Sequence, residues 1–261
     1  MRLVKGLLER CTEMMERLAA GPLGVSELAA ALDMPKSAVH RLLQELRRLA
    51  WVEQTSDGRY RASLGFALLG SRVMQASGLP DQVQPLLDRL AAETRELVRL
   101  TIVTGKGLAW LASAQGAPAG LVYAPEMAGP VRLFATANGK ALLARMPAAD
   151  ALALARADGF GTLRPTERSL HDAAALLADL TAVRRRGYAI ADGEAESGVT
   201  AVAVAIGNIP RGTVSVAGPS VRLPASRHAA LAASLTTTAA ALANRFPFNT
   251  QQQEPIACAS N

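Results

Sequence analysis

Residues Val25–Leu46, VSELAAALDMPKSAVHRLLQEL, decide the fold of the N-terminal part of the chain. Apolar residues recur at helical spacing in the leading half, where Ser26 is expected to cap a short helix. Asp33-Met34-Pro35 then turns the chain. A second helix is expected from Lys36 to Ala50, apolar on one side and polar on the other. Two helices joined by a tight turn predict a helix-turn-helix.

The sequence on both sides of this stretch completes the motif. An apolar periodicity from Leu3 to Leu18 predicts an earlier helix, which Gly21-Pro22 ends. After the motif, Trp51–Gln54 and Arg59–Arg61 are two short strand-like runs joined by Ser56-Asp57-Gly58, and an Asp-Gly turn is a strong hairpin signal. Three helices followed by a hairpin predict a winged helix-turn-helix.

A connector follows the hairpin. Leu64–Ala76 has a helical pattern, and Ser77-Gly78-Leu79-Pro80 breaks it. The expected organisation is a winged helix-turn-helix over residues 1–63, a linker helix over 64–80, a second domain over 81–246 and a disordered tail over 247–261.

From Asp81 onward helical and strand-like segments alternate. They predict an α+β domain, a mostly antiparallel sheet flanked by helices. Helices are expected at residues 83–97, 139–145, 148–156, 172–186 and 226–245. Strands are expected at residues 98–103, 108–113, 120–123, 188–191, 200–206 and 213–216.

The composition is that of a folded protein with one or two domains. Of 261 residues, 50% are hydrophobic and 19% charged, which is too apolar for a disordered chain. The net charge of +6 is compatible with a nucleic-acid partner. Cys11 and Cys258 lie at opposite ends without ligand spacing, so no disulfide framework, metal or cofactor is expected. Because there is no signal-peptide core and no apolar run of membrane-span length, we expect a cytoplasmic protein with no membrane partner.

Polar residues on one side of the 36–50 helix are the sharpest functional signal. An α-helix fits the DNA major groove, where Arg bonds guanine, and Ser or Gln bonds base edges or phosphates. Arg59 and Arg61 on the hairpin are expected to face phosphates or a minor groove. The alternative is a merely solvated helix face, but the adjoining turn and hairpin favour double-stranded operator DNA as the partner. The predicted DNA-binding residues are Lys36, Ser37, His40, Arg41, Gln44, Arg59 and Arg61.

The Val25–Leu46 stretch resembles the DNA-binding motif of the IclR family of bacterial transcription regulators. Four later stretches resemble that family's effector-domain landmarks in order: Ala135–Ala144 (ATANGKALLA), Val183–Ala189 (VRRRGYA), Gly198-Val199 and Val214–Pro219 (VSVAGP). The resemblance covers about residues 1–245. It implies a GAF-like effector-binding C-terminal domain in a homodimeric or homotetrameric repressor or activator.

Two departures from the family pattern concern the effector. The family often has His where Phe134 stands, and an acidic residue near Ala191 or Gly193. The acids nearby in this chain are Asp192, Glu194 and Glu196.

The segment from Thr136 to Leu143 has the chemistry of a ligand cradle. Small residues let a ligand approach the backbone, and N–H groups at a helix start attract an anion, so a small carboxylate is the expected effector. On spacing alone, close packing of Ala137 and Gly139 against a sheet explains the segment equally well, and the resemblance favours the ligand. The predicted effector-binding residues are Val131, Ala137, Asn138, Gly139, Asp192, Ser215 and Ala217.

Catalysis finds little support in the sequence. The 3 histidines are not paired with a nucleophile in a recognisable motif, and there is no GxSxG, HExxH or P-loop. No catalytic residue and no enzyme activity are therefore expected. Two functions stay open: a ligand-responsive transcription regulator, and a metabolite-binding protein or enzyme that uses its winged helix for protein contacts.

Overall fold

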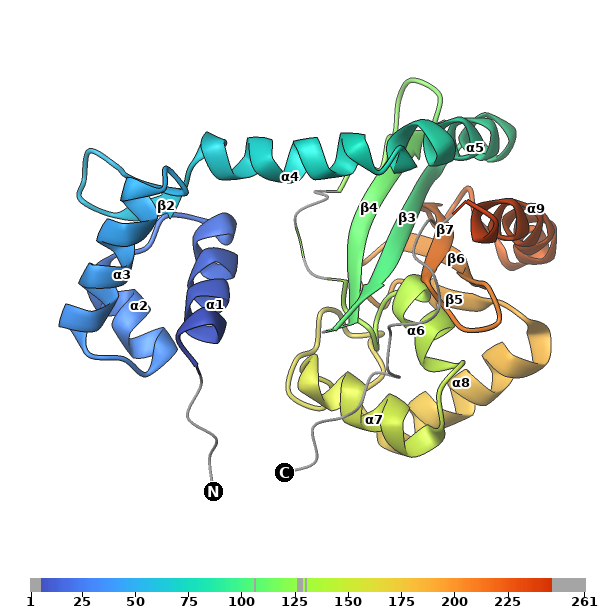
Figure 1. Cartoon of the computed structure of the whole chain (residues 1–261). Coiled ribbons are helices and arrows are strands. Elements are labelled where there is room, and N and C mark those ends of the chain that lie inside the picture. Colours follow the sequence, from blue (N-terminus) through green and yellow to red (C-terminus); the bar gives the residue numbers. More distant parts are fainter. Residues whose placement is uncertain (1–5, 106, 126–128, 130, 246–261) are drawn as a thin grey trace. The chain divides into compact units, whose positions relative to one another are not determined.

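The structure, a computed structural model, describes residues 6–105, 107–125, 129 and 131–245. The chain divides between Ser77 and Gly78 into two compact units. The predicted tail at 247–261 lies outside the described residues. The first unit contains helices α1 (Leu7–Ala20), α2 (Val25–Leu32), α3 (Lys36–Arg48) and α4 (Leu64–Ala76), with the hairpin strands β1 (Val52–Gln54) and β2 (Tyr60–Ala62) (Figure 1).

Local backbone signals set the limits of α2 and α3. Asp33 ends α2 in the left-handed conformation, with φ of 51°. The expected cap at Ser26 is wrong, because α2 begins at Val25 with Gly24 as its N-cap, and the N–H of Gly24 donates to Glu27 Oε2 at 2.6 Å. The helix α3 ends at Arg48, before the predicted limit of Ala50, which has a φ of 56° and leads into β1.

The first unit has a core of its own. Met14 of α1, Leu28 of α2 and Leu43 of α3 are fully buried together. The N–H of Tyr60 in β2 donates to Leu23 O at 2.8 Å, which joins the hairpin to the α1–α2 connection. The predicted winged helix-turn-helix is confirmed.

Helix α4 has the limits that the sequence predicts, but none of its residues is buried. Its apolar side chains Leu64, Leu68 and Val73 are 80%, 57% and 64% exposed. Leu64 and Leu68 are four residues apart, as are Leu69 and Val73, so exposed apolar side chains lie on more than one side of the helix. Exposed apolar residues at this density are typical of a contact surface rather than of a bare linker.

The second unit is an α+β fold with one sheet of five strands. Its neighbouring strands follow the order β4-β3-β7-β6-β5, and all pairs are antiparallel. The elements are α5 (Leu79–Thr94), β3 (Leu97–Thr104), β4 (Gly107–Gln115), α6 (Ala137–Leu143), α7 (Ala148–Ala157), α8 (Ala173–Arg186), β5 (Ala189–Asp192), β6 (Val199–Ile206), β7 (Gly212–Pro219) and α9 (Ala225–Ala243).

Five of the predicted strands are present, and the strand predicted at 120–123 is wrong. That segment is irregular and is tied down by side chains instead of a strand ladder. Arg222 donates to Leu121 O at 2.6 Å, and the hydroxyl of Tyr123 donates to Glu196 at 3.1 Å.

Helices cover both faces of the sheet (Figure 1). On the α5/α9 face the strands contribute mainly valines, leucines and isoleucines, among them Val98, Val202 and Val216. On the α6/α8 face they contribute small residues, among them Ala191 and Ala203. The alternation of side chains along each strand therefore gives one bulky aliphatic face and one face lined by small residues.

Candidate DNA-binding and effector sites

The side of α3 that is predicted to contact DNA bases does not pack against the core. The apolar residues Val39, Leu43 and Leu46 are buried. The five predicted contact residues on this helix all lie exposed: Lys36, Ser37, His40, Arg41 and Gln44. Arg41 forms no ion pair within the described part of the chain.

The two arginines of the hairpin are engaged inside the first unit. Arg59 donates to both carboxylate oxygens of Glu27, at 3.1 and 2.9 Å, and to Pro22 O at 3.1 Å. Arg61 donates to Glu53 at 2.6 Å across the hairpin. Arg59 therefore links the hairpin to the N-terminus of α2, a role that the sequence did not indicate.

Most of the predicted effector residues are buried between α6 and the sheet or close by, and Asp192 is the exception. Ser215 and Ala217 alternate along β7 on the α6 face and are buried. Asn138 of α6 belongs to this group, because its side-chain amide donates to Thr213 Oγ1 at 2.9 Å. Ala137 and Val131 are also buried.

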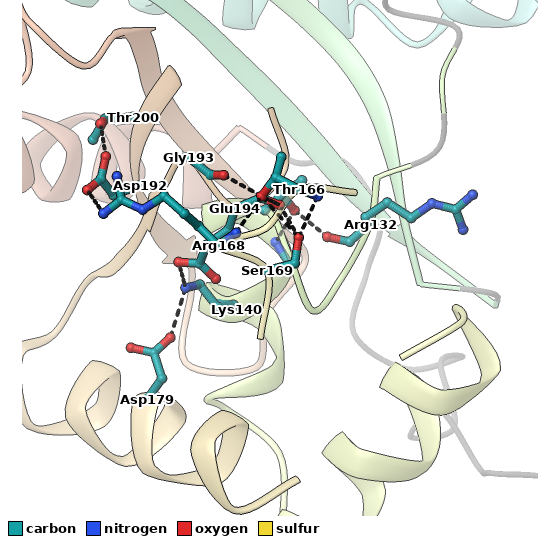
Figure 2. Close-up of polar contacts among 12 residues, drawn as sticks. Arg132, Lys140, Thr166, Arg168, Ser169, Asp179, Asp192, Gly193, Glu194 and Thr200 are labelled. Carbon is teal, nitrogen blue, oxygen red and sulfur yellow. Dashed lines mark hydrogen bonds and ion pairs between the residues drawn. The ribbon is translucent and has the colours of Figure 1, made fainter. Parts of the chain in front are cut away.

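Asp192 does not share that face, which corrects the expected grouping. It follows Ala191 on β5, so the two side chains leave opposite sides of the sheet. Its carboxylate accepts hydrogen bonds from Thr200 Oγ1 and from Arg168, both at 2.7 Å (Figure 2). The Thr200 hydrogen bond, with the nearby Arg168 charge, lowers the pKa of Asp192.

Gly139 lies where two backbone segments meet closely. A Cβ at this position would lie 2.2 Å from Leu133 Cα, so packing accounts for the glycine. Its N–H donates to Thr136 Oγ1 at 3.1 Å. The expectation that Gly139 offers an unpaired N–H to a carboxylate is therefore wrong, because the helix's own N-cap residue accepts it.

Lys140 is the centre of a buried charge cluster that the sequence did not indicate (Figure 2). Its side chain is 1% exposed, and its Nζ lies 2.7 Å from Glu194 Oε1 and 2.9 Å from Asp179 Oδ2. Burial raises the pKa of Glu194, and the Lys140 charge opposes that rise. The only sequence signal was a lysine inside the apolar ANGKALLA segment.

The loop that carries Glu194 is fixed from a second side. Thr166 Oγ1 donates to Gly193 O and Ser169 Oγ donates to Glu194 O, each at 2.6 Å (Figure 2). Both bonds hold backbone carbonyls of the loop in place. The loop backbone is therefore fixed at the residue whose carboxylate accepts from Lys140.

Arg99 is a second buried charge outside the predicted site. It lies on β3 directly opposite Ser215 of β7 and is 8% exposed. Its guanidinium carbon lies 3.8 Å from the ring centre of Trp110 and 5.9 Å from that of Tyr123. The available signal was a single arginine inside the strand-like run LVRLTIVT.

A cavity of about 660 Å³ lies apart from the predicted effector residues. Its wall comes mainly from α6, α8, β6 and α9, with Arg145, Arg184 and Tyr188 as its larger polar side chains. Arg145 donates to Asn208 O and Arg184 to Ala144 O, so both guanidinium groups have backbone partners.

Two further findings concern membranes and metals. Among the described residues, no helix combines the length and the apolar character that crossing a bilayer requires. Nor do three His, Cys, Asp or Glu side chains in this part of the chain come together as a metal site.

Comparison with known proteins decides the family. The family described as "Bacterial transcriptional regulator IclR C-terminal" matches residues 71–244, and the "IclR helix-turn-helix domain" matches residues 7–56. The chain belongs to the IclR family of transcriptional regulators. The expectation drawn from sequence resemblance is confirmed, and with it a DNA-binding helix-turn-helix in a transcription regulator.

Relatives and solved structures agree with this assignment. The HTH-type transcriptional regulator BhcR of Paracoccus denitrificans is 32% identical over 231 residues, covering 86% of this chain and 81% of that protein. A putative IclR regulator from Silicibacter sp. TM1040 superposes with a TM-score of 0.81 at 25% identity, covering 92% of this chain and 96% of that one. An IclR homologue from Microbacterium hydrocarbonoxydans, solved in complex with 4-hydroxybenzoate, has a TM-score of 0.69 at 22% identity, covering 92% and 98%.

Proposed function

We propose that this IclR-family regulator binds a double-stranded operator through α3, and that a small organic acid bound in its C-terminal unit changes the affinity for that operator. It acts in the cytoplasm as a homodimer or homotetramer. The observation that carries the proposal is the exposed polar side of α3, set on a winged helix-turn-helix whose core is complete without it.

The DNA-contacting groups fall into two classes in this proposal. Arg41 has no partner ion within the described residues, so its guanidinium is available for a base edge. Arg59 and Arg61 are held by Glu27 and Glu53, and they position the hairpin next to the DNA backbone.

Replacing Arg41 by Ala is expected to weaken binding to the specific operator by about 1–3 kcal/mol and to relax preference at one base position. The measurement is a salt-dependent gel shift on the DNA beside the regulator's own gene, with unrelated DNA of equal length. Arg48→Ala, which removes an exposed arginine paired with Glu45 at the far end of α3, is the matched control and should change little. Unchanged specific affinity in a folded Arg41→Ala protein would contradict the role of α3.

The face of the sheet that α6 covers supports an effector site. Ser215, Ala217 and Asn138 meet there, and ligand sites combine apolar walls with a few placed polar groups. The complex of the Microbacterium homologue with 4-hydroxybenzoate shows that one protein of this fold binds an organic acid. The test is a melting-temperature screen with organic acids, followed by gel shifts with any acid that stabilises the protein.

The exposed apolar residues of α4 support self-association through a second copy of the chain. A twofold dimer doubles the number of base pairs that α3 reads. We expect light scattering to return at least twice the chain mass of 27.3 kDa, and Leu68→Glu/Val73→Glu to lower the measured mass. Ala67→Glu is the control, because this exposed position of the same helix lies about 100° or more around the axis from Leu68 and from Val73. A wild-type protein of 27.3 kDa at micromolar concentration would refute this expectation.

A further inference from the structure

The charge distribution of the sheet singles out Arg99. The five strands contain only two charged residues, Arg99 and Asp192. Asp192 leaves the sheet on the side opposite Ser215, where its carboxylate is bonded to Thr200 and Arg168. Arg99 is therefore the one charge that the strands present on the small-residue face, beside Ser215 and in line with Thr101, whose hydroxyl lies 2.7 Å from Thr213 Oγ1.

Residues 6–105, 107–125, 129 and 131–245 provide no counter-ion for this buried cation. No carboxylate among the described residues forms an ion pair with Arg99, and its Nε has no hydrogen-bond partner. Glu196, whose charge acts on Arg99 through space, accepts the hydroxyl of Tyr123 instead. Burial accordingly lowers the pKa of Arg99. The rings of Trp110 and Tyr123 stabilise the guanidinium only in part, because a cation–π contact does not replace a hydrogen-bonded anion.

We propose that Arg99 is the carboxylate-binding residue of the effector site, with Ser215 as its neighbouring hydroxyl. This inference rests on the proposed effector function of the C-terminal unit. A guanidinium presents a planar fork of donors that matches a carboxylate, and the Trp110 ring at 3.8 Å fixes the plane of that fork. Within the part of the chain that the structure describes, the Ser215 hydroxyl has only a long contact, 3.5 Å to Arg99 O.

Two groups of α6 that could bind an anion are already engaged. The Gly139 N–H is donated to Thr136, and the only charged side chain of α6, Lys140, is committed to Glu194 and Asp179. Arg99 therefore supplies the positive charge that the helix does not. A small acid placed at Arg99 lies against Ser215 and the alanines of β6 and β7.

The first experiment uses Trp110 as a reporter. Trp51→Phe leaves Trp110 as the only tryptophan of the chain. The probes are sodium acetate, lactate, benzoate and 4-hydroxybenzoate, each matched by its neutral amide and titrated to millimolar concentration. We expect at least one carboxylate, and not its amide, to change Trp110 emission. Arg99→Met should then raise the Kd about tenfold or more, and Arg99→Lys should restore part of the affinity.

The control variant is Arg145→Met at the separate cavity, which should leave the Kd unchanged. Loss of binding in Arg145→Met but not in Arg99→Met would place the ligand in that cavity and overturn the proposal. Equal affinity of Arg99→Met and the parent, or no response to any carboxylate, would also overturn it.

A second readout needs no ligand. Removing an uncompensated buried charge should raise the melting temperature of ligand-free Arg99→Met by several degrees. A lower melting temperature would instead show that the guanidinium is a structural part of the Trp110–Tyr123 stack and would overturn the proposal.

Gel shifts separate this inference from the proposed function. An amide that changes both Trp110 emission and operator retention would overturn the role of Arg99 and leave the ligand-responsive regulator standing. A carboxylate that binds through Arg99 without any effect on operator retention would keep Arg99 and overturn the proposed function.

Discussion

Lys140→Met is expected to lower the free energy of unfolding by about 3–5 kcal/mol at neutral pH, because removing one partner leaves buried charges uncompensated. Lys140 is 1% exposed and lies within 3 Å of both Glu194 and Asp179. Met keeps a comparable length without the charge, so the loss measures electrostatics more than packing. The measurement is urea unfolding followed by circular dichroism.

The difference in the free energy of unfolding between wild type and Lys140→Met should become smaller as the pH falls. Burial already raises the pKa of Glu194, and without Lys140 the rise is larger. A carboxyl with a raised folded-state pKa binds its proton more tightly in the folded chain, so its contribution favours folding at low pH and is lost as the pH rises through that pKa. Acidification toward the raised pKa therefore neutralises the uncompensated carboxylate.

Two variants test that explanation. Lys140→Met/Glu194→Gln should recover part of the lost stability at neutral pH, since the amide carries no charge. Arg61→Met, which breaks an exposed pair with Glu53, should cost less than about 1 kcal/mol. If Lys140→Met lowered the free energy of unfolding equally at every pH, and the double variant recovered none of it, lost packing and not charge would cause the effect.

Local signals predict the first unit closely, because its structure depends on short-range periodicity and turn chemistry. The helix at Leu64–Ala76 has the predicted limits, and the Asp57-Gly58 turn is followed by the second strand of the hairpin. The same signals predict five strands of the sheet in the second unit. They fail at residues 120–123, where contacts from Arg222 and Glu196, both distant in sequence, hold the chain irregular.

The effector region is harder to predict, because strand parity and tertiary contacts decide it. Asp192 and Ser215 both look like polar site residues in the sequence. Through Thr200, however, Asp192 lines up with Gly218, an odd number of residues from Ser215, so the two side chains leave opposite faces of the sheet. Arg99 and Lys140 are single charges in apolar segments. The residues next to such a charge in the sequence do not indicate whether it has an ion-pair partner. Lys140 contacts carboxylates from α8 and from the loop after β5, whereas Arg99 contacts two aromatic rings.

Gly139→Ala is expected to destabilise the second unit by about 3 kcal/mol, the upper range for overpacking a well-packed core. In an ordinary helix this change would stabilise, since Ala is the better helix former. At Gly139, however, the new Cβ would lie 2.2 Å from Leu133 Cα and 2.3 Å from Leu133 O, which are backbone atoms that cannot rotate away. All residues of α6 are buried, so the helix has no exposed side toward which it can move without opening the core.

The matched control for Gly139→Ala is Gly70→Ala in α4, where a Cβ would meet nothing within 4 Å. That change should be neutral or stabilising by up to about 1 kcal/mol, as expected for an exposed helix interior. Urea unfolding of both variants measures the difference. Equal and small effects would show that α6 can shift away from Leu133, and the close packing of Gly139 would then no longer explain why this position has no side chain.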